Sequence, residues 1–172
     1  MFRYLFIFVL FGITAANASL SDVTVKFPSE ENPAKLYAKS YYDNGTLKAE
    51  GWEMGDMKMG YWIFYYENGQ IKSKGHFQNN TKNGYWHFYS EDGVVKKEGH
   101  YMSGKSENWW IFYDLANATT TKFQFKNNKK NGYALCYKNN KLKRAEKYKD
   151  NQKVGTWTSF YAFKRDNPNV SF

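Results

Sequence analysis

The chain has 172 residues, of which 20% are aromatic and 24% are charged, and it carries a formal net charge of +9 at neutral pH. This length suits one domain rather than two, and the single cysteine, Cys136, excludes an intramolecular disulfide. The aromatic content favours β-structure, and the positive charge favours anionic partners such as lipid headgroups, acidic glycans, nucleic acid or an acidic protein.

Residues 1–18 have the pattern of a secretory signal. Arg3 is followed by the apolar run "YLFIFVLFG", and Ala16-Asn17-Ala18 forms a small-x-small cleavage site before Ser19. The apolar run is short for a bilayer, which takes about 20 residues to cross, so we expect export to the periplasm or the exterior with cleavage rather than an uncleaved anchor. Loss of Arg3 lowers the net charge by one, from +9 to +8. No later segment is apolar enough to predict a membrane span.

A short segment precedes the main body of the chain. Residues 19–34 contain Pro28 and Pro33 and are expected to be a loose or capping N-terminal segment. Residues 35–161 form a repeat domain, and residues 162–172 form a C-terminal tail that is loose or capping, because terminal units of repeat proteins are usually atypical.

Glycines recur every 24 residues through the repeat domain. Three such series share one register. They are Gly60, Gly84 and Gly132, with Asn108 in the missing place; Gly45, Gly69 and Gly93; and Gly51, Gly75 and Gly99.

Each unit has the sequence pattern of a β-hairpin. Asn68-Gly69 lies between two apolar runs and predicts a two-residue loop in which both residues have positive φ. That loop pairs Trp62 with Gly75 and Phe64 with Ser73. We therefore expect an all-β fold, a single-layer antiparallel meander of tandem 24-residue β-hairpin repeats. Later units are less regular, with a shorter Asn139-Asn140 turn and Cys136 as a small buried hydrophobe.

A glycine opposite each tryptophan has two interpretations. Gly75 faces Trp62 and Gly99 faces Trp86, which leaves room for an indole to lie over the neighbouring strand. The alternative is a β-bulge at the glycine.

The repeated segment "GYWIFYYENGQIKSKGHF" resembles the MORN repeat (membrane occupation and recognition nexus). The 24-residue spacing is most similar to the bacterial variant of that repeat, found in proteins labelled YwqK-type antitoxins. The resemblance extends from Lys35 to about Tyr161. It implies an array that acts as a scaffold, a lipid binder or a partner-docking module, and the antitoxin label implies neutralisation of a cognate toxin by binding.

The predicted pairing divides the hairpin side chains between two faces. The tryptophan face holds Trp62, Phe64, Gly75, Phe77 and their equivalents. The ladder face holds aromatic columns beside a file of lysines, and it is the candidate surface for an extended anionic or amphipathic ligand. Cross-strand stabilisation alone, or a curved sheet that folds the columns inward, would also explain the pattern. The candidate binding residues are Tyr61, Tyr65, Lys72, Lys74, Tyr85, Tyr89, Lys96, Trp109, Tyr113, Lys122, Tyr133 and Tyr137.

The sequence contains no pattern typical of catalysis. Equivalent histidines His76 and His100 would lie about 10 Å apart, too far to share one ion, so we expect no metal site and no cofactor. No catalytic or nucleotide-binding motif occurs, so we expect no enzyme activity and no nucleic-acid partner. The expected function is an exported binding module that docks a protein partner, with an antitoxin or immunity role as its specific form. Association with anionic lipid or glycan at the envelope is the alternative.

Overall fold

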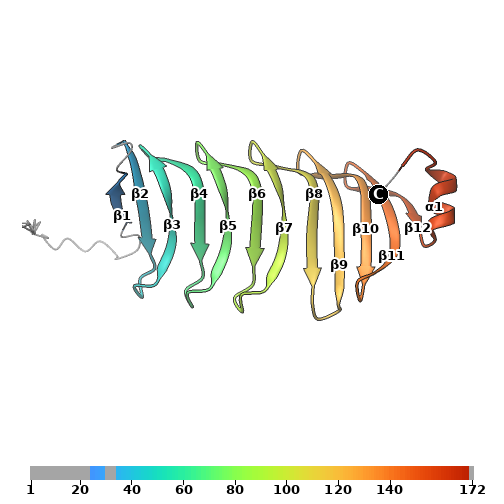
Figure 1. Ribbon diagram of the computed structural model, residues 1–172, viewed down its shortest axis with the longest axis horizontal. Coiled ribbons are helices and arrows are strands. Elements are labelled where there is room, and N and C mark those ends of the chain that lie inside the picture. The colour runs from blue at the N-terminus through green and yellow to red at the C-terminus, as the bar shows by residue number, and fades with distance from the viewer. Residues whose placement is uncertain (1–23, 30–33, 171–172) are drawn as a thin grey trace, which may run out of the picture.

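The computed structural model describes residues 24–29 and 34–170, and these form one antiparallel sheet of twelve strands in chain order (Figure 1). The predicted signal, residues 1–18, lies outside the described residues. The strands are β1 Thr24–Pro28, β2 Lys35–Tyr41, β3 Leu47–Met54, β4 Met57–Tyr65, β5 Ile71–Gln78, β6 Thr81–Tyr89, β7 Val95–Met102, β8 Lys105–Asp114, β9 Thr119–Lys126, β10 Lys129–Lys138, β11 Lys141–Lys149 and β12 Gln152–Trp157, followed by one helix, α1 Phe160–Asp166.

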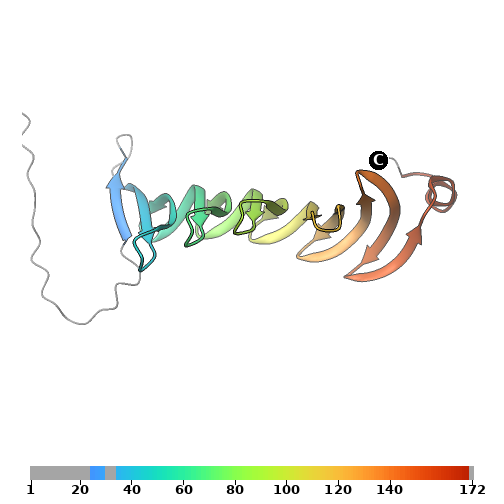
Figure 2. The ribbon, with the colours of Figure 1, turned by 90° about the horizontal axis from the view of Figure 1, so that it is seen from below.

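The sheet is a single elongated layer, as the repeat pattern predicted. Every strand pairs with its neighbours in the sequence, so the long axis of the molecule crosses the strands. Viewed from below, the sheet twists and its last strands curve, while α1 lies beyond β12 (Figure 2). The predicted all-β meander of tandem hairpins is therefore confirmed.

The two ends of the sheet carry elements that the repeat pattern did not define. β1, within the predicted N-terminal segment, pairs with β2 from Thr24 opposite Ser40 to Pro28 opposite Leu36. Helix α1 begins after Ser159, whose Oγ accepts a hydrogen bond from the Ala162 N–H at 3.2 Å. This helix spans the boundary predicted at residue 161, because seven residues are too few to give a clear helical period.

The Asn-Gly corners differ from the predicted two-residue loops. The Tyr66 carbonyl accepts a hydrogen bond from the Gly69 N–H at 3.0 Å, and the Tyr66 N–H donates to the Gln70 carbonyl at 2.8 Å. The loop therefore has three residues, of which Gly69 alone has a positive φ, at 82°. The pairing shifts by one residue between Phe64 and Tyr65. This β-bulge compensates for the longer loop and restores the predicted pairing of Trp62 with Gly75.

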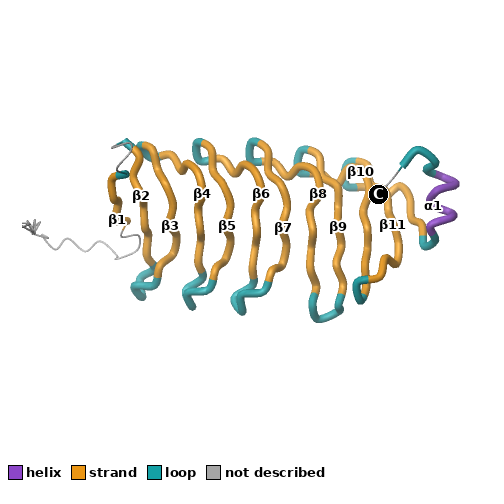
Figure 3. The backbone as a smooth tube through the Cα atoms, in the orientation of Figure 1, coloured by secondary structure: helices purple, strands orange, loops and turns teal. Residues whose placement is uncertain are grey.

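Two-residue turns with positive φ occur mostly at the opposite ends of the strands, where the loops connect successive hairpins (Figure 3). Asn79 and Asn80 have φ of 49° and 61°, and Asn127 and Asn128 have φ of 51° and 66°. Asparagine tolerates this left-handed region better than most residues. The predicted short turn at Asn139-Asn140 is confirmed by φ values of 51° and 58°. Asn108, which replaces a repeat glycine, also has a positive φ of 57°.

The indoles of Trp62, Trp86 and Trp110 each lie over a glycine of the preceding hairpin. A Cβ atom added to Gly75 would lie 2.4 Å from the ring of Trp86, which belongs to the next unit. The indole therefore comes from the next hairpin and not from Trp62, the residue paired with Gly75 within its own hairpin. The pairing of β5 with β6 also shifts register between Lys74 and His76. Gly75 therefore lies at an irregularity of the ladder and also under an indole, so the two interpretations of this glycine both hold.

This arrangement recurs along the tryptophan face. The Trp86 indole N–H donates to the His76 carbonyl at 3.0 Å, and Trp62 and Trp110 make the equivalent bonds to Trp52 and His100 at 2.9 and 3.0 Å. The three indoles are 3%, 0% and 2% exposed in chain order. A single-layer sheet thus buries its tryptophans against its own neighbouring units, which fixes the register of one hairpin on the next.

Candidate binding surfaces

The ladder face keeps most of the residues predicted for it. Lys74 lies across from Ile63, and Lys122 lies across from Ile111 and Leu135. By strand register the face also carries Tyr61, Tyr65, Tyr85, Tyr89, Trp109, Tyr113, Tyr133 and Tyr137.

Charge alternates in sign along this face instead of forming a file of lysines. Glu50, Lys74, Glu98 and Lys122 occupy equivalent positions 24 residues apart. Lys74 lies over the Tyr89 ring at 5.6 Å, and Lys122 lies over its equivalent, Tyr137, at 5.5 Å. Of the expected lysine file, Lys74 and Lys122 remain on this face, where they alternate with Glu50 and Glu98.

Both glutamates accept a hydrogen bond from a tyrosine and lie close to a basic side chain. Glu50 accepts a hydrogen bond from the Tyr65 hydroxyl at 2.6 Å and lies 3.5 Å from the Lys39 ammonium. Glu98 accepts from the Tyr113 hydroxyl at 2.7 Å, and its second oxygen lies 3.3 Å from His87 Nε2. Burial, together with the hydrogen bond to Glu98, raises the pKa of Tyr113 to about 12, so this hydroxyl remains a donor at neutral pH. Both carboxylates of the ladder face therefore have partners within the face, whereas Lys74 and Lys122 have no carboxylate within ion-pairing distance in the described residues.

The C-terminal end of the ladder face is covered. The Phe163 ring of α1 lies 5.6 Å from the Tyr133 ring, and the Tyr133 hydroxyl donates to Asn167 Oδ1 at 2.8 Å. A hollow of about 660 Å³ remains beside this contact. It is lined by Trp109, Ile111, Lys122, Gln124, Tyr133, Leu135, Tyr137 and Val170.

Lys72 does not lie on the ladder face as expected. The β-bulge leaves it without a cross-strand partner, between the pairs Phe64–Ser73 and Tyr65–Ile71. It lines a groove together with Ser73 and Trp86, which belong to the tryptophan face. The same shift between the Phe88–Lys97 and Tyr89–Val95 pairs leaves Lys96 in the equivalent bulge position. The sequence-based prediction assumed a two-residue loop without a bulge. Strict alternation of faces from that loop placed Lys72 and Lys96 on the ladder face, whereas the bulge changes the alternation at these positions.

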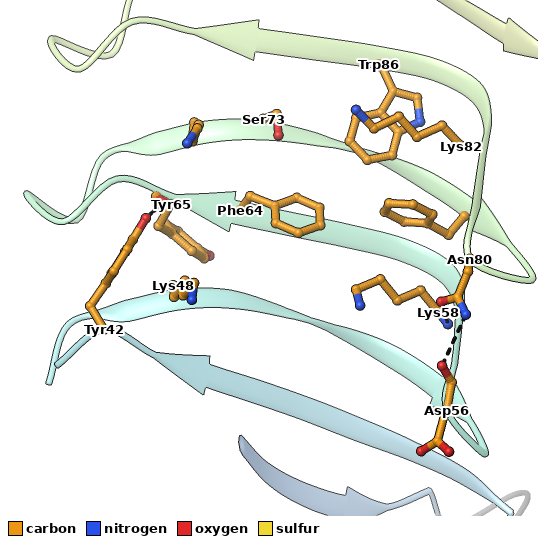
Figure 4. A pocket seen from close by; sticks show the side chains of 12 residues that line it. Tyr42, Lys48, Asp56, Lys58, Phe64, Tyr65, Ser73, Asn80, Lys82 and Trp86 are labelled. Atoms are coloured by element: carbon orange, nitrogen blue, oxygen red, sulfur yellow. Dashed lines mark hydrogen bonds between the residues drawn. The ribbon is translucent and has the colours of Figure 1, made fainter. Parts of the chain in front are cut away.

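The groove on the tryptophan face has a volume of about 710 Å³ and is lined by residues of three successive hairpins, from β3 to β6 (Figure 4). Phe64, Phe77 and Trp86 form its apolar part. Its charged side chains are four lysines and one aspartate, namely Lys48, Lys58, Lys72, Lys82 and Asp56. The Asp56 carboxylate lies 3.9 Å from the Lys26 ammonium, at one end of the groove.

All four of these lysines lie over aromatic rings, and two of them lie over tryptophans. The Lys58 Nζ atom is 4.9 Å from the Trp62 ring centroid, and the Lys82 Nζ atom is 4.5 Å from that of Trp86. Phe88 and Tyr101 also lie under Lys82, at 5.0 and 5.4 Å. Burial, and then the nearby charge of Lys97, lower the pKa of Lys82. An ammonium that is partly desolvated without an anion gains stability when an anion arrives.

Lys58, Lys72 and Lys82 have no carboxylate within ion-pairing distance in the described part of the chain. The two faces differ in the order of charges along their columns rather than in aromatic content. The sequence contained a signal for this difference: position 74 of the ladder column is followed by Glu98, whereas positions 48, 72 and 96 are all lysine.

In the described ranges, no group of three His, Cys, Asp or Glu side chains could hold a metal ion. Cys136 is buried, and burial raises the pKa of its thiol. Among residues 24–29 and 34–170, no helix has the length and apolarity needed to cross a bilayer.

Three segments of the chain match the family model described as "MORN repeat variant", at residues 37–51, 60–79 and 82–102. These segments lie within β2 to β7 and include the Asn-Gly and Asp-Gly loops and two of the three buried tryptophans. The resemblance to the MORN repeat is thus confirmed for three repeats, whereas the match does not extend to the antitoxin family. The search of curated proteins gave no significant match.

Proposed function

We propose that this protein is an exported, non-enzymatic binding module that docks an acidic protein partner on its tryptophan face. The observation that carries this proposal is that the groove lysines Lys58, Lys72 and Lys82 have no carboxylate within ion-pairing distance in the described residues. Repeats of this type are commonly binding modules. On the ladder face Glu50 and Glu98 alternate with Lys74 and Lys122, so an acidic partner would gain less there from charge.

The chemistry of the groove suits a protein segment. The rings of Phe64, Phe77 and Trp86 offer apolar contact, while Lys58 and Lys82 offer charge beside them. Aromatic anchors inside a polar rim are typical of protein-binding surfaces. The signal pattern of residues 1–18 supports export, and the repeat type supports an antitoxin or immunity role as the specific form of this binding.

Affinity capture with matched charge variants tests the proposal. The bait variants are K58M/K82M, which alter the tryptophan face, and K74M/K122M, which alter the ladder face. Each pair removes two positive charges and leaves an apolar stem over the aromatic ring. We expect acidic proteins from envelope or culture fractions to be captured by the wild-type protein and by K74M/K122M, and to be lost with K58M/K82M. Loss with the ladder variant alone, or equal capture by all three baits, would overturn the proposal.

Anionic lipid or glycan is the second candidate, because the same unpaired lysines would attract any anionic surface. Co-sedimentation with phosphatidylcholine vesicles, with and without 30% anionic lipid, would separate the two candidates. Binding to a surface through exposed charge should weaken strongly as salt is raised. We expect weak sedimentation that does not depend on Lys58 and Lys82. Strong, salt-sensitive sedimentation that requires both lysines would favour the lipid-binding function.

A further inference from the structure

The lysines of the tryptophan face are arranged with a regular period. Lys48, Lys72 and Lys96 occupy the bulge positions of β3, β5 and β7, each 24 residues after the last. Lys58 and Lys82 form a second file with the same step, near the other end of the strands. In each file, one step corresponds to two strands of the sheet. Neighbouring strands lie about 4.8 Å apart, so successive lysines of a file are about 9.6 Å apart.

This period selects the conformation of an acidic segment that crosses the strands. A polyproline II helix has three residues per turn and rises about 3.1 Å per residue, so every third side chain returns to the same side after about 9.3 Å. An extended β-strand returns after about 6.8 Å, which does not match the lysine step. Seven residues of an α-helix span about 10.5 Å, a mismatch of about 0.9 Å at each step.

The walls of the groove suit the same conformation. Polyproline II segments dock in grooves lined by aromatic rings, and the rings of Phe64, Phe77 and Trp86 provide such a lining here. Figure 4 shows Lys58 and Lys82 at the same end of the groove, with Phe64 and Trp86 beside them. Acidic side chains at every third position would meet one lysine per hairpin, while the residues between them lie on the rings.

We infer that the tryptophan face binds an acidic, proline-rich segment in the polyproline II conformation, with a carboxylate at every third residue. This inference rests on the proposed function and specifies the chemistry of the partner. The partly buried Lys82, whose pKa is lowered in the unbound protein, would recover a counter-charge on binding. The ladder face has no equivalent run, because its column alternates between lysine and glutamate.

Fluorescence anisotropy with synthetic peptides tests the inference on the intact protein. The first peptide repeats Glu-Pro-Pro four times. The second has the same four glutamates and eight prolines, with the glutamates placed at every second position. We expect the first peptide to bind at least tenfold more tightly. K58M/K82M should lose at least tenfold in affinity for it, and K74M/K122M should bind it as the wild-type protein does.

Several outcomes would overturn the inference. Equal affinity for the two peptides, or no binding of either, would exclude the three-residue period, and so would tighter binding of an alanine-rich helical peptide with glutamates seven residues apart. None of these results decides the proposed function, which the capture experiment tests independently. If the peptides bind equally but lose affinity with K58M/K82M, the acidic docking surface stands and the polyproline II conformation does not.

Discussion

At the scale of single residues, glycine and tryptophan act as a pair that joins neighbouring units. Gly75 has no side chain because the Trp86 ring occupies the space where its Cβ would be. The indole N–H then bonds the carbonyl of the next residue, His76. The ring contacts and this hydrogen bond both connect one hairpin to the next. The glycine series of Gly51, Gly75 and Gly99 therefore marks the contacts between hairpins, while other repeat glycines mark turns.

Replacing Gly75 by alanine should therefore destabilise the protein by about 1–3 kcal/mol, the usual cost of forcing atoms into a packed site. Urea unfolding followed by tryptophan fluorescence would measure the change. The control is G69N, because a Cβ at Gly69 meets nothing within 4 Å and asparagine tolerates its φ of 82°. We expect the control to cost less than the alanine at Gly75, because it adds backbone strain without steric overlap. An equal effect of the two substitutions would contradict the packing role of Gly75.

Glu146 is the second residue with a defined energetic role. It is only 5% exposed at its side chain and lies 2.8 Å from Arg144 Nε and 3.4 Å from Lys153 Nζ. Burial alone would raise the pKa of Glu146, but hydrogen bonds from Arg144 and Tyr148 outweigh burial and lower it. The folded state therefore holds this carboxyl ionised more strongly than the unfolded chain does.

The sign of the pH dependence follows from this lowered pKa. The stabilisation by Glu146 is complete above its unfolded pKa, near 4.5, and is lost as the pH falls through the lower folded value. E146Q should cost about 1–3 kcal/mol at pH 7, and this difference from the wild-type protein should shrink below pH 4.5. Urea unfolding at pH 7, 5, 4 and 3 would measure it. A difference that stays constant down to pH 3 would contradict the assignment.

At the scale of elements, loops and strands differ in how far the sequence could predict them. The 24-residue period was enough to predict the strands and the pairing of Trp62 with Gly75. A change of register by one residue would move every side chain of a strand to the other face, so the repeated pattern allows only one register. The loop at Asn68-Gly69 was mispredicted because a longer loop with a bulge restores the same pairing further along the strands. That bulge changes the face of Lys72, so the candidate site was the part of the prediction most sensitive to the loop.

Helix α1 is the element that the repeat could not predict, and it has a local function. Phe163 is 3% exposed and packs against Leu135 and Ala145 at the C-terminal end of the sheet. It closes the ladder face where no further hairpin follows among the described residues. In a repeat array each unit depends mainly on its neighbours, so the effect of this contact should be confined to the last strands.

F163A should therefore open the C-terminal strands and leave the rest of the sheet intact. Loss of a buried phenylalanine side chain typically costs about 3–5 kcal/mol. Hydrogen–deuterium exchange would show faster exchange in β10 to β12 and unchanged protection in β4 to β7. F160A is the matched control, since Phe160 is in the same helix but is 74% exposed, and it should leave exchange unchanged. Uniform loss of protection along the whole sheet would contradict the local role of the helix.

At the scale of the whole molecule, a single-layer sheet offers two faces that differ in their order of charges. The repeat places aromatic residues on both faces, so aromatic content alone could not identify the binding face from the sequence. The order of charges decides between them: Glu50 and Glu98 alternate with lysines on the ladder face, whereas Lys48, Lys72 and Lys96 follow one another on the tryptophan face without an intervening glutamate. The central claim is that the tryptophan face is where an acidic partner docks.

The indole N–H resonances of the protein test this claim most directly, because they report on both faces in one spectrum. Trp86 lies under Lys82 on the tryptophan face, and Trp109 lies on the ladder face beside Tyr133. During titration with the peptide that repeats Glu-Pro-Pro four times, we predict that the Trp86 indole resonance shifts in proportion to saturation while that of Trp109 stays in place. A shift of Trp109 with no change at Trp86 would contradict the account.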